Sequence, residues 1–396
     1  MNFAPPALSS SDLLSPMTKA AAPAPHALPD SWPSPGLAAT IAECRPFYHG
    51  KRVLVTGAFG FVGGHLARAL HACGAQVGAL DREVNPGAGS QIELAGLRDD
   101  VEIFPVDITD MNAVCHTVRE GRFDFIFHLA AGATTIESAM GDPYATIMAN
   151  TMGFVNFAEC ARRLPREERP VLLLSSTDKV YGESEALPYD EEKSALRGVG
   201  VYDAAKLAAD IFAGMYHQAL GLETIVLRMC NLFGPYDFNT DYRLIPKAMR
   251  NIFRDHDAPE LYFSSLQHFR DYLYVEDAAR AFLLLGREQK CRGHVFNLPG
   301  AHYASTPDVL REVIQAVAAL QQRAHDEGNE PLAKWDWNRH IRLIDSSLSA
   351  MTISKQHLCG EKIKAATNFE PTMELQEGLQ KTAAFYAWYF GNRRCA

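Results

Sequence analysis

The sequence predicts an α/β protein with a doubly wound, Rossmann-like parallel sheet and a smaller C-terminal α/β lobe. Apolar runs of strand length alternate with helical stretches from Lys51 to Arg228, which is the order that produces a parallel sheet. A glycine-rich turn joins the first strand to the first helix, as doubly wound folds require. The 396 residues can bury a sizeable core and suggest two or three domains.

Residues 1–46 are rich in Ala, Pro and Ser and have little helical or strand periodicity. Such a composition buries too little apolar surface to offset the entropy lost on ordering. We therefore expect a mostly disordered extension, in which any anchoring contact lies near residues 37–47.

The first strand, residues 51–56, breaks at Gly57 and continues as a helix. Gly57 allows the tight turn, Gly60 lets a pyrophosphate approach the backbone, and Gly63 lets the helix pack closely on the strand. The first helical turn then points free N–H groups at an anion. Cofactor contacts are expected along the turn from Gly57, Phe59, Gly60, Phe61, Val62 and Gly63.

A second strand, residues 76–81, ends in Asp81 about twenty residues later. A carboxylate at this place hydrogen-bonds the hydroxyls of the adenosine ribose, and it repels the 2′-phosphate of NADP. The pattern therefore predicts NAD as the cofactor. The alternative is an ordinary strand–helix turn with no ligand.

The remaining elements continue the alternation and then lose it. We expect strands at 101–107, 123–129, 171–175 and 223–228, and helices at 110–119, 143–163 and 201–220. After Arg228 the elements are irregular, with a strand at 272–275, a helix from 276 and a final amphipathic helix at 374–389. We predict a cofactor domain over 47–230, to which part of 270–300 returns, and a substrate lobe over 231–391. The polar segment 321–338 fits neither pattern.

Charge and cysteine content limit the possible partners. The net charge of −9 argues against nucleic acid or an anionic membrane as the main partner. No apolar run reaches the length of a membrane span, and the N-terminal residues lack the charged-then-apolar order expected of a signal peptide. The eight cysteines are scattered without metal-site spacing, so we expect reduced thiols, no metal and a cytoplasmic protein.

Polar residues follow the fifth strand and open a later helix. Thr177 lies just past the strand, where the nicotinamide end of a dinucleotide should arrive. Tyr202 and Lys206 stand four residues apart and share one helix face. A nearby ammonium lowers the pKa of a phenol, so Tyr202 is predicted to act as a base, with Thr177 hydrogen-bonding the same substrate oxygen.

Together these motifs resemble the extended short-chain dehydrogenase/reductase superfamily, and within it the NAD-dependent epimerase/dehydratase family. The resemblance covers residues 50–390 and also rests on the runs 128–131, 228–235 and 270–277, and on Asn150. It implies an enzyme that binds NAD and a nucleoside-diphosphate sugar. A non-catalytic NAD-binding sensor is the alternative from another class, and the intact set of Thr177, Tyr202 and Lys206 argues against it.

Asp178 and Lys179 resemble the acid–base pair of sugar-nucleotide 4,6-dehydratases, most closely the CDP-glucose enzymes. The resemblance implies that NAD oxidises C4, Lys179 removes the C5 proton, and Asp178 protonates the departing C6 hydroxyl. Residues 180–182 instead match dTDP-glucose dehydratases and many epimerases, and a 2-epimerase loop has Asn in place of Asp178. An epimerase acting at C4 or C2 is therefore the alternative reaction, and a salt bridge between Asp178 and Lys179 is the alternative structure.

The resemblance also assigns binding residues and an assembly. It places Asp107 and Ile108 at the adenine, although such an Asp also caps helices. Further cofactor contacts are expected from Leu129, Ala130, Ala131 and Asn150, and contacts to the substrate pyrophosphate from Asn231, Arg270, Arg243 and Lys247. A homodimer is expected to pair the helices at 143–163 and 201–220, with Phe154, Phe157 and Ala161 on one face; alternatively, that face packs on the sheet.

Overall fold

The computed structural model describes residues 32–85, 89–133, 136–326, 341–345 and 352–392. A central sheet has the strand order β10-β6-β5-β4-β1-β2-β3, and every neighbouring pair is parallel. The predicted doubly wound sheet is confirmed. Its strands are β1 (Arg52–Thr56), β2 (Gln76–Asp81), β3 (Glu102–Pro105), β4 (Phe125–His128), β5 (Val171–Thr177), β6 (Thr224–Met229) and β10 (Val295–Leu298).

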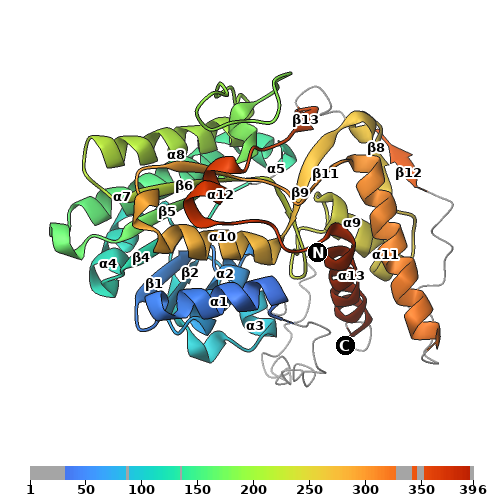
Figure 1. The fold of residues 1–396 in the computed structure, drawn as a ribbon, viewed down its shortest axis with the longest axis horizontal. Helices are drawn as coiled ribbons and strands as arrows, with labels where there is room; N and C mark the ends of the chain where they lie inside the picture. The colour runs from blue at the N-terminus through green and yellow to red at the C-terminus, as the bar shows by residue number, and fades with distance from the viewer. Residues whose placement is uncertain (1–31, 86–88, 134–135, 327–340, 346–351, 393–396) are drawn as a thin grey trace, which may run out of the picture.

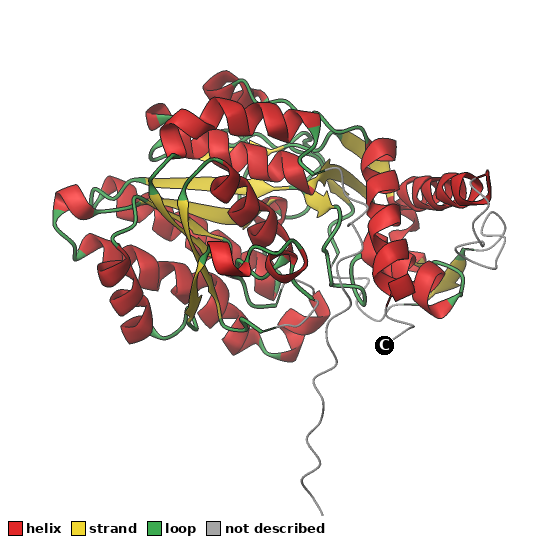
Figure 2. Ribbon diagram, turned by 90° about the horizontal axis from the view of Figure 1, so that it is seen from below, coloured by secondary structure: helices red, strands yellow, loops and turns green. Residues whose placement is uncertain are grey.

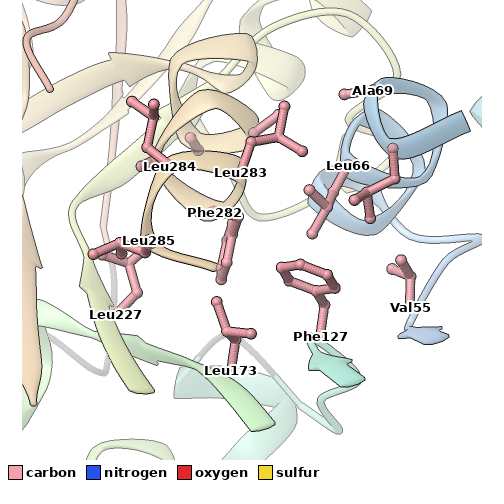
Figure 3. Packing of buried hydrophobic residues seen from close by; sticks show 14 of the residues in the cluster. Val55, Leu66, Ala69, Phe127, Leu173, Leu227, Phe282, Leu283, Leu284 and Leu285 are labelled. Carbon is pink, nitrogen blue, oxygen red and sulfur yellow. The ribbon is translucent and has the colours of Figure 1, made fainter. Parts of the chain in front are cut away.

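Helices cover both faces of this sheet (Figure 2). On one face lie α1 (Pro35–Tyr48), α2 (Phe61–Ala72) and α10 (Val275–Arg287), and on the other α4 (Met111–Gly121), α7 (Gly153–Arg162) and α8 (Val201–Gln218). Alternate strand residues point to opposite faces. Phe127 therefore packs with Phe282 of α10 (Figure 3), while Ile126 belongs to the core on the other face. Among the described residues, no helix combines the length and apolarity needed to cross a bilayer.

Shorter helices complete this domain. They are α3 (Gln91–Leu94), α5 (Ile136–Gly141) and α6 (Pro143–Ile147), and a π-helical turn over Met148–Met152 connects α6 to α7. The helical stretch predicted at 143–163 is therefore confirmed as one continuous run with a π-turn inside it.

The C-terminal lobe is built around β9 (Phe269–Tyr274) and lies beside the main sheet (Figure 1). β9 pairs with β7 (Asn231–Phe233), β11 (His302–Ser305) and β13 (Lys355–Gln356), and β8 (Glu260–Tyr262) pairs with β12 (Arg342–Ile344). The helices α9 (Leu244–Arg250), α11 (Thr306–Asp326) and α13 (Leu375–Asn392) enclose a separate apolar core with them. Of the polar segment 321–338, residues 321–326 end α11 and the others lie outside the described residues.

The chain passes between the two parts more than once. After β6 it enters the lobe, and then α10 packs on the main sheet and β10 pairs with β6. After β13 it returns again as α12 (Glu361–Thr367), which packs against β10. The second return was not predicted from the sequence, because one short helix carries no signal of which domain it joins.

Helix α1 corrects the prediction of disorder for its part of residues 1–46. Leu37, Ile41, Cys44 and Tyr48 are buried against α2 and α10, and the Tyr48 hydroxyl donates to Leu283 O at 2.9 Å. These side chains recur at intervals of three and four residues, which is a helical pattern within an Ala- and Pro-rich composition. Residues 1–31 lie outside the described residues.

The structure also corrects the expectation of reduced thiols throughout. Cys115 of α4 and Cys160 of α7 form a disulfide, with their Cα atoms 5.0 Å apart. Because the two cysteines are 45 residues apart in sequence, only the packing of α4 on α7 brings them together. Cys44, Cys73, Cys230, Cys291 and Cys359 are free.

We expect reduction of this disulfide to lower the free energy of unfolding by about 4 kcal/mol, the loop-closure contribution for a cross-link spanning 45 residues. Denaturant unfolding with and without dithiothreitol measures the effect, and Cys115→Ser should reproduce it without reductant. Cys359→Ser removes a free thiol and should leave stability unchanged. Equal stability of the wild type in both conditions would contradict the prediction.

Candidate active site

The turn between β1 and α2 has the shape of a phosphate cradle. Gly57 has a φ of +70°, in the left-handed region that favours glycine, and a Cβ there would lie 2.8 Å from Ala130 N. A Cβ at Gly63 would lie 2.0 Å from Gly57 O. No larger side chain fits either position, so backbone N–H groups remain open to a ligand at the start of α2.

The predicted cofactor residues converge on two adjoining cavities of about 480 and 420 Å³. Asp81 lines both, and its Oδ2 accepts a hydrogen bond from Phe59 N at 3.3 Å. Burial raises the pKa of Asp81. The larger cavity is also lined by Gly57, Phe59, Gly60, Phe61, Val62, Gly63, Leu129, Ala130, Ala131, Tyr202 and Lys206, and the smaller by Asp107, Ile108, Ala130 and Ala131. Two adjoining cavities, one with a glycine cradle and both lined by the Asp81 carboxylate, fit a dinucleotide.

Asn150 does not line either cavity. It lies in the π-turn between α6 and α7, is 1% exposed, and donates through Nδ2 to Thr146 O at 2.9 Å. Its Oδ1 has no hydrogen-bond partner among the described residues. Asn150 is therefore placed to shape the turn rather than to touch a ligand in this cavity.

A third cavity of about 350 Å³ lies next to the larger cofactor cavity. Thr177, Asp178 and Lys179 line it at the end of β5, and Tyr202 and Arg243 line both this cavity and the cofactor cavity. The carboxyl ends of β5 and β6 thus bring together groups that are far apart in sequence. A substrate in the third cavity would meet the cofactor at Tyr202.

Asp178 is a buried carboxyl group, and one of its two oxygens has no hydrogen-bond partner among the described residues. Its side chain is 3% exposed, Oδ1 accepts from Thr177 Oγ1 at 3.1 Å, and Oδ2 has no hydrogen-bond partner among the described residues. Desolvation raises the pKa of Asp178 to about 6, against the opposing charges of Lys179 and Arg270. Asp178 and Lys179 form no salt bridge in the described structure; the Lys179 ammonium lies 5.7 Å from the ring centre of Tyr202. Asp178 can therefore hold a proton in this cavity.

Tyr202 and Lys206 share one face of α8, but the predicted pKa relation between them is corrected. Lys206 is 1% exposed and donates to Ser175 O at 3.0 Å, and burial lowers the pKa of its ammonium to about 8. Burial also raises the pKa of the Tyr202 phenol, which Arg243 opposes. In the ligand-free protein the phenol is thus protonated, and Lys206 alone does not ionise it.

The predicted pyrophosphate residues separate into two groups. Asn231 and Arg243 line the third cavity, where Asn231 Nδ2 is buried without a partner among the described residues and Arg243 binds Asp237 at 3.0 Å. Lys247 lies outside the lining and forms a salt bridge with Glu260 at 2.8 Å. Arg270 also lies outside it and donates to the carbonyls of Phe269 and Ser354, each at 2.8 Å.

Sequence reasoning missed polar residues behind the cavity. Asp210, Arg228 and Tyr181 are buried and bonded to one another next to the β5 turn. Asp210 follows Lys206 by four residues, so its place on the same helix face was readable from the spacing. Arg228 and Tyr181 carried no such signal, because their contact spans 47 residues.

Comparison with known proteins agrees with this geometry. Residues 53–298 match the family described as NAD dependent epimerase/dehydratase. The chain is 29% identical over 352 residues to a dTDP-glucose 4,6-dehydratase of Streptomyces niveus, covering 86% of this chain and 94% of the relative. It is 26% identical over 374 residues to UDP-glucuronate 4-epimerase 4 of Arabidopsis thaliana, covering 88% and 78%. The fold matches that of a Streptomyces venezuelae dTDP-glucose 4,6-dehydratase, solved with NAD, at a TM-score of 0.72, 23% identity and coverage of 86% and 98%.

Proposed function

Because this chain belongs to the NAD-dependent epimerase/dehydratase family, we propose that it is a nucleotide-sugar 4,6-dehydratase. It would convert a nucleoside-diphosphate hexose to the 4-keto-6-deoxy sugar. The observation that carries the proposal is Asp178, a buried carboxyl with a raised pKa that lines the same cavity as Tyr202 and whose Oδ2 has no hydrogen-bond partner among the described residues. A 4-epimerase expels no leaving group and has no need of such an acid.

The glycine turn and Asp81 would hold NAD, which when bound would supply the oxidant for C4 and the reductant for C6. Tyr202 is the proposed base for the C4 hydroxyl, with Thr177 hydrogen-bonded to the same oxygen; it must first lose its own proton, which the positive charge of a bound nicotinamide together with Lys206 would favour. Lys179 removes the C5 proton, which the new ketone has made acidic. Asp178 then protonates the C6 hydroxyl, which leaves as water. As C6 is reduced, Lys179 returns its proton to C5, so the substrate loses one water and the cofactor ends unchanged.

Asn231 and Arg243 are proposed to hold the diphosphate of the substrate. Both line the third cavity, which we call the sugar cavity. The Arg243 guanidinium can exchange Asp237 for a phosphate in a charge-assisted contact. Lys247 and Arg270 already have partners in the described structure, so they are better placed to support the lobe than to bind the substrate.

An epimerase acting at C4 or C2 is the second candidate, and a similar 4-epimerase among the relatives favours it. The test is the mass of the product from dTDP-, UDP-, GDP- and CDP-hexoses, after a melting screen for the nucleotide that stabilises the protein. A 4,6-dehydratase gives a product one water lighter and no net NADH. A product with the mass of the substrate would establish the epimerase, and binding without turnover would leave the NAD-binding sensor.

A homodimer is proposed through α6 and α8, but not through the predicted face. Phe154, Phe157 and Ala161 are fully buried in their own sheet core, so the prediction that they form the interface is wrong. The spacing of these three residues showed that they share one face of the helix, but not whether that face packs on the sheet or on a second subunit. The apolar side chains that remain exposed on these adjacent helices are Tyr144, Ile147, Ile211, Phe212 and Met215.

We expect Ile211→Glu to convert the dimer to a monomer in light scattering at micromolar concentration. Ile211 is 59% exposed, and a charge there would be buried without a partner in the pair. Leu343 is similarly exposed on β12, and Leu343→Glu should leave the dimer intact. A monomeric wild type would reject the proposal.

A cytoplasmic location remains a prediction. The Cys115–Cys160 disulfide is more typical of an oxidising compartment. Cell fractionation together with thiol labelling of the isolated protein measures both properties.

A further inference from the structure

A buried set of polar contacts joins the turn that holds Asp178 to helix α8. Arg228, in β6, lies at its centre: Nε donates to Asp210 Oδ2 at 2.7 Å, and Nη1 donates to the Tyr181 hydroxyl at 2.8 Å. That hydroxyl in turn donates to Asn297 Oδ1 at 2.7 Å. All four side chains are at most 4% exposed. We call Tyr181, Arg228 and Asp210 the relay.

Each end of the relay is attached to a part of the proposed machinery. Tyr181 is the last residue of the 3-10 turn η4 (Asp178–Tyr181), which carries both the proposed acid and Lys179. Asp210 follows Lys206 by one helical turn and Tyr202 by two, so the three share a face of α8. The relay therefore sets the distance between the η4 turn and the helix that carries Tyr202.

The relay residues do not themselves reach the sugar cavity. None of the three is in its lining, whereas Asp178, Lys179 and Tyr202 all are. Their contacts are also hard to replace, because a buried charge or hydroxyl that loses its partner is not rehydrated. They can act on the reaction only by placing the residues that touch the substrate.

The two halves of the reaction depend on the relay to different degrees. Tyr202 and Lys206 belong to a long helix, and Lys206 is also bonded to Ser175 O. The η4 turn is short. Apart from the relay, the Thr177 hydroxyl bonds Asp178 Oδ1 and Lys179 N, and Val180 O accepts from Arg197 N at 2.9 Å and Gly198 N at 3.0 Å. Loosening Tyr181 should displace Asp178 and Lys179 while leaving Tyr202 in place.

We propose that Tyr181, Arg228 and Asp210 are positioning residues for the elimination step, because they hold Asp178 and Lys179 at a fixed position relative to Tyr202. The inference rests on the proposed dehydratase function. Elimination at C5 and C6 requires the turn and the helix to act on one sugar, whereas oxidation at C4 requires only the helix and the cofactor.

Tyr181→Phe tests this with a single-turnover experiment that follows the absorbance of enzyme-bound NADH. The ring should keep its stacking on Tyr189, whose centre lies 4.6 Å away, while the hydroxyl is lost. NADH should form at close to the wild-type rate, and its decay should slow on the order of 10- to 100-fold, as for a small misplacement of reacting groups. Arg228→Lys keeps the charge beside Asp210 but loses the planar fork, and it should give the same split.

Tyr48→Phe is the matched control, since it removes an equally buried hydroxyl that bonds Leu283 O of α10 and lines neither the sugar cavity nor the larger cofactor cavity. It should lower stability and leave both rates unchanged. If Tyr181→Phe slows the formation and the decay of NADH equally, or changes neither rate, the relay has only a structural role and the proposal is overturned. A wild-type product with the mass of the substrate overturns the dehydratase function itself, and that result is obtained before any variant is made.

Discussion

Asp178→Asn is expected to stop the enzyme after C4 oxidation, so that bound NADH accumulates while release of the 4-keto-6-deoxy product falls by about 10²- to 10⁴-fold. The amide keeps the size of the side chain but cannot donate an acid proton to the departing C6 hydroxyl. Tyr202, Lys206 and the cofactor cavity are untouched, so oxidation at C4 should continue. Rapid mixing with substrate, read by NADH absorbance and by product mass, measures both quantities in one sample.

The control is Asp190→Asn, which removes a carboxylate on the loop that follows the same turn. Asp190 pairs with Lys193 at 2.9 Å on the surface, away from the sugar cavity. Its loss should leave turnover unchanged. Full dehydratase activity in Asp178→Asn would remove Asp178 from the role of acid.

The raised pKa of Asp178 also sets the sign of the pH dependence. A general acid acts in its protonated form, and the pKa of Asp178 is about 6 in the ligand-free protein. Ionisation of Asp178 should therefore give the kcat/KM for elimination a limb that falls about tenfold per pH unit above pH 6. In Asp178→Asn this limb of the pH profile should disappear.

Tyr202→Phe is expected to block the reaction one step earlier and leave no bound NADH. Without the phenol oxygen, the proton of the C4 hydroxyl has no acceptor at the place where the two cavities meet. Loss of a general base costs about 10²- to 10⁴-fold, and every later step depends on this one. The same rapid-mixing experiment should show neither NADH nor product above the residual rate.

Tyr216→Phe is the matched control on the same helix. Tyr216 is 5% exposed and packs in the core on the α7 side, away from both cavities. Near wild-type turnover is expected there. Accumulation of NADH in Tyr202→Phe would assign the C4 proton to another group and contradict the proposed order of steps.

Local patterns account for what the sequence could predict. The glycine turn, Asp81 and the spacing of Tyr202 and Lys206 each lie within one or two elements, and the structure brings them to one edge of the sheet. The Cys115–Cys160 disulfide and the Arg228–Tyr181 contact join residues 45 and 47 positions apart, and no local pattern encodes them. The pKa of Tyr202 was misjudged for a related reason, since the desolvation that raises it depends on the whole surrounding fold.

The repeated passage of the chain between the two parts has a consequence for biosynthesis. Strand β6 ends at Met229, and its outer neighbour β10 begins only at Val295. At about 5–20 residues per second, a ribosome leaves that strand edge unpaired for roughly 3 to 13 s. An exposed edge can recruit other strands, so the nascent chain passes through an aggregation-prone interval that ends only after the first part of the lobe, from β7 to β9, has been translated. This protein cannot mature domain by domain as it emerges, and we expect it to depend on chaperones during that interval.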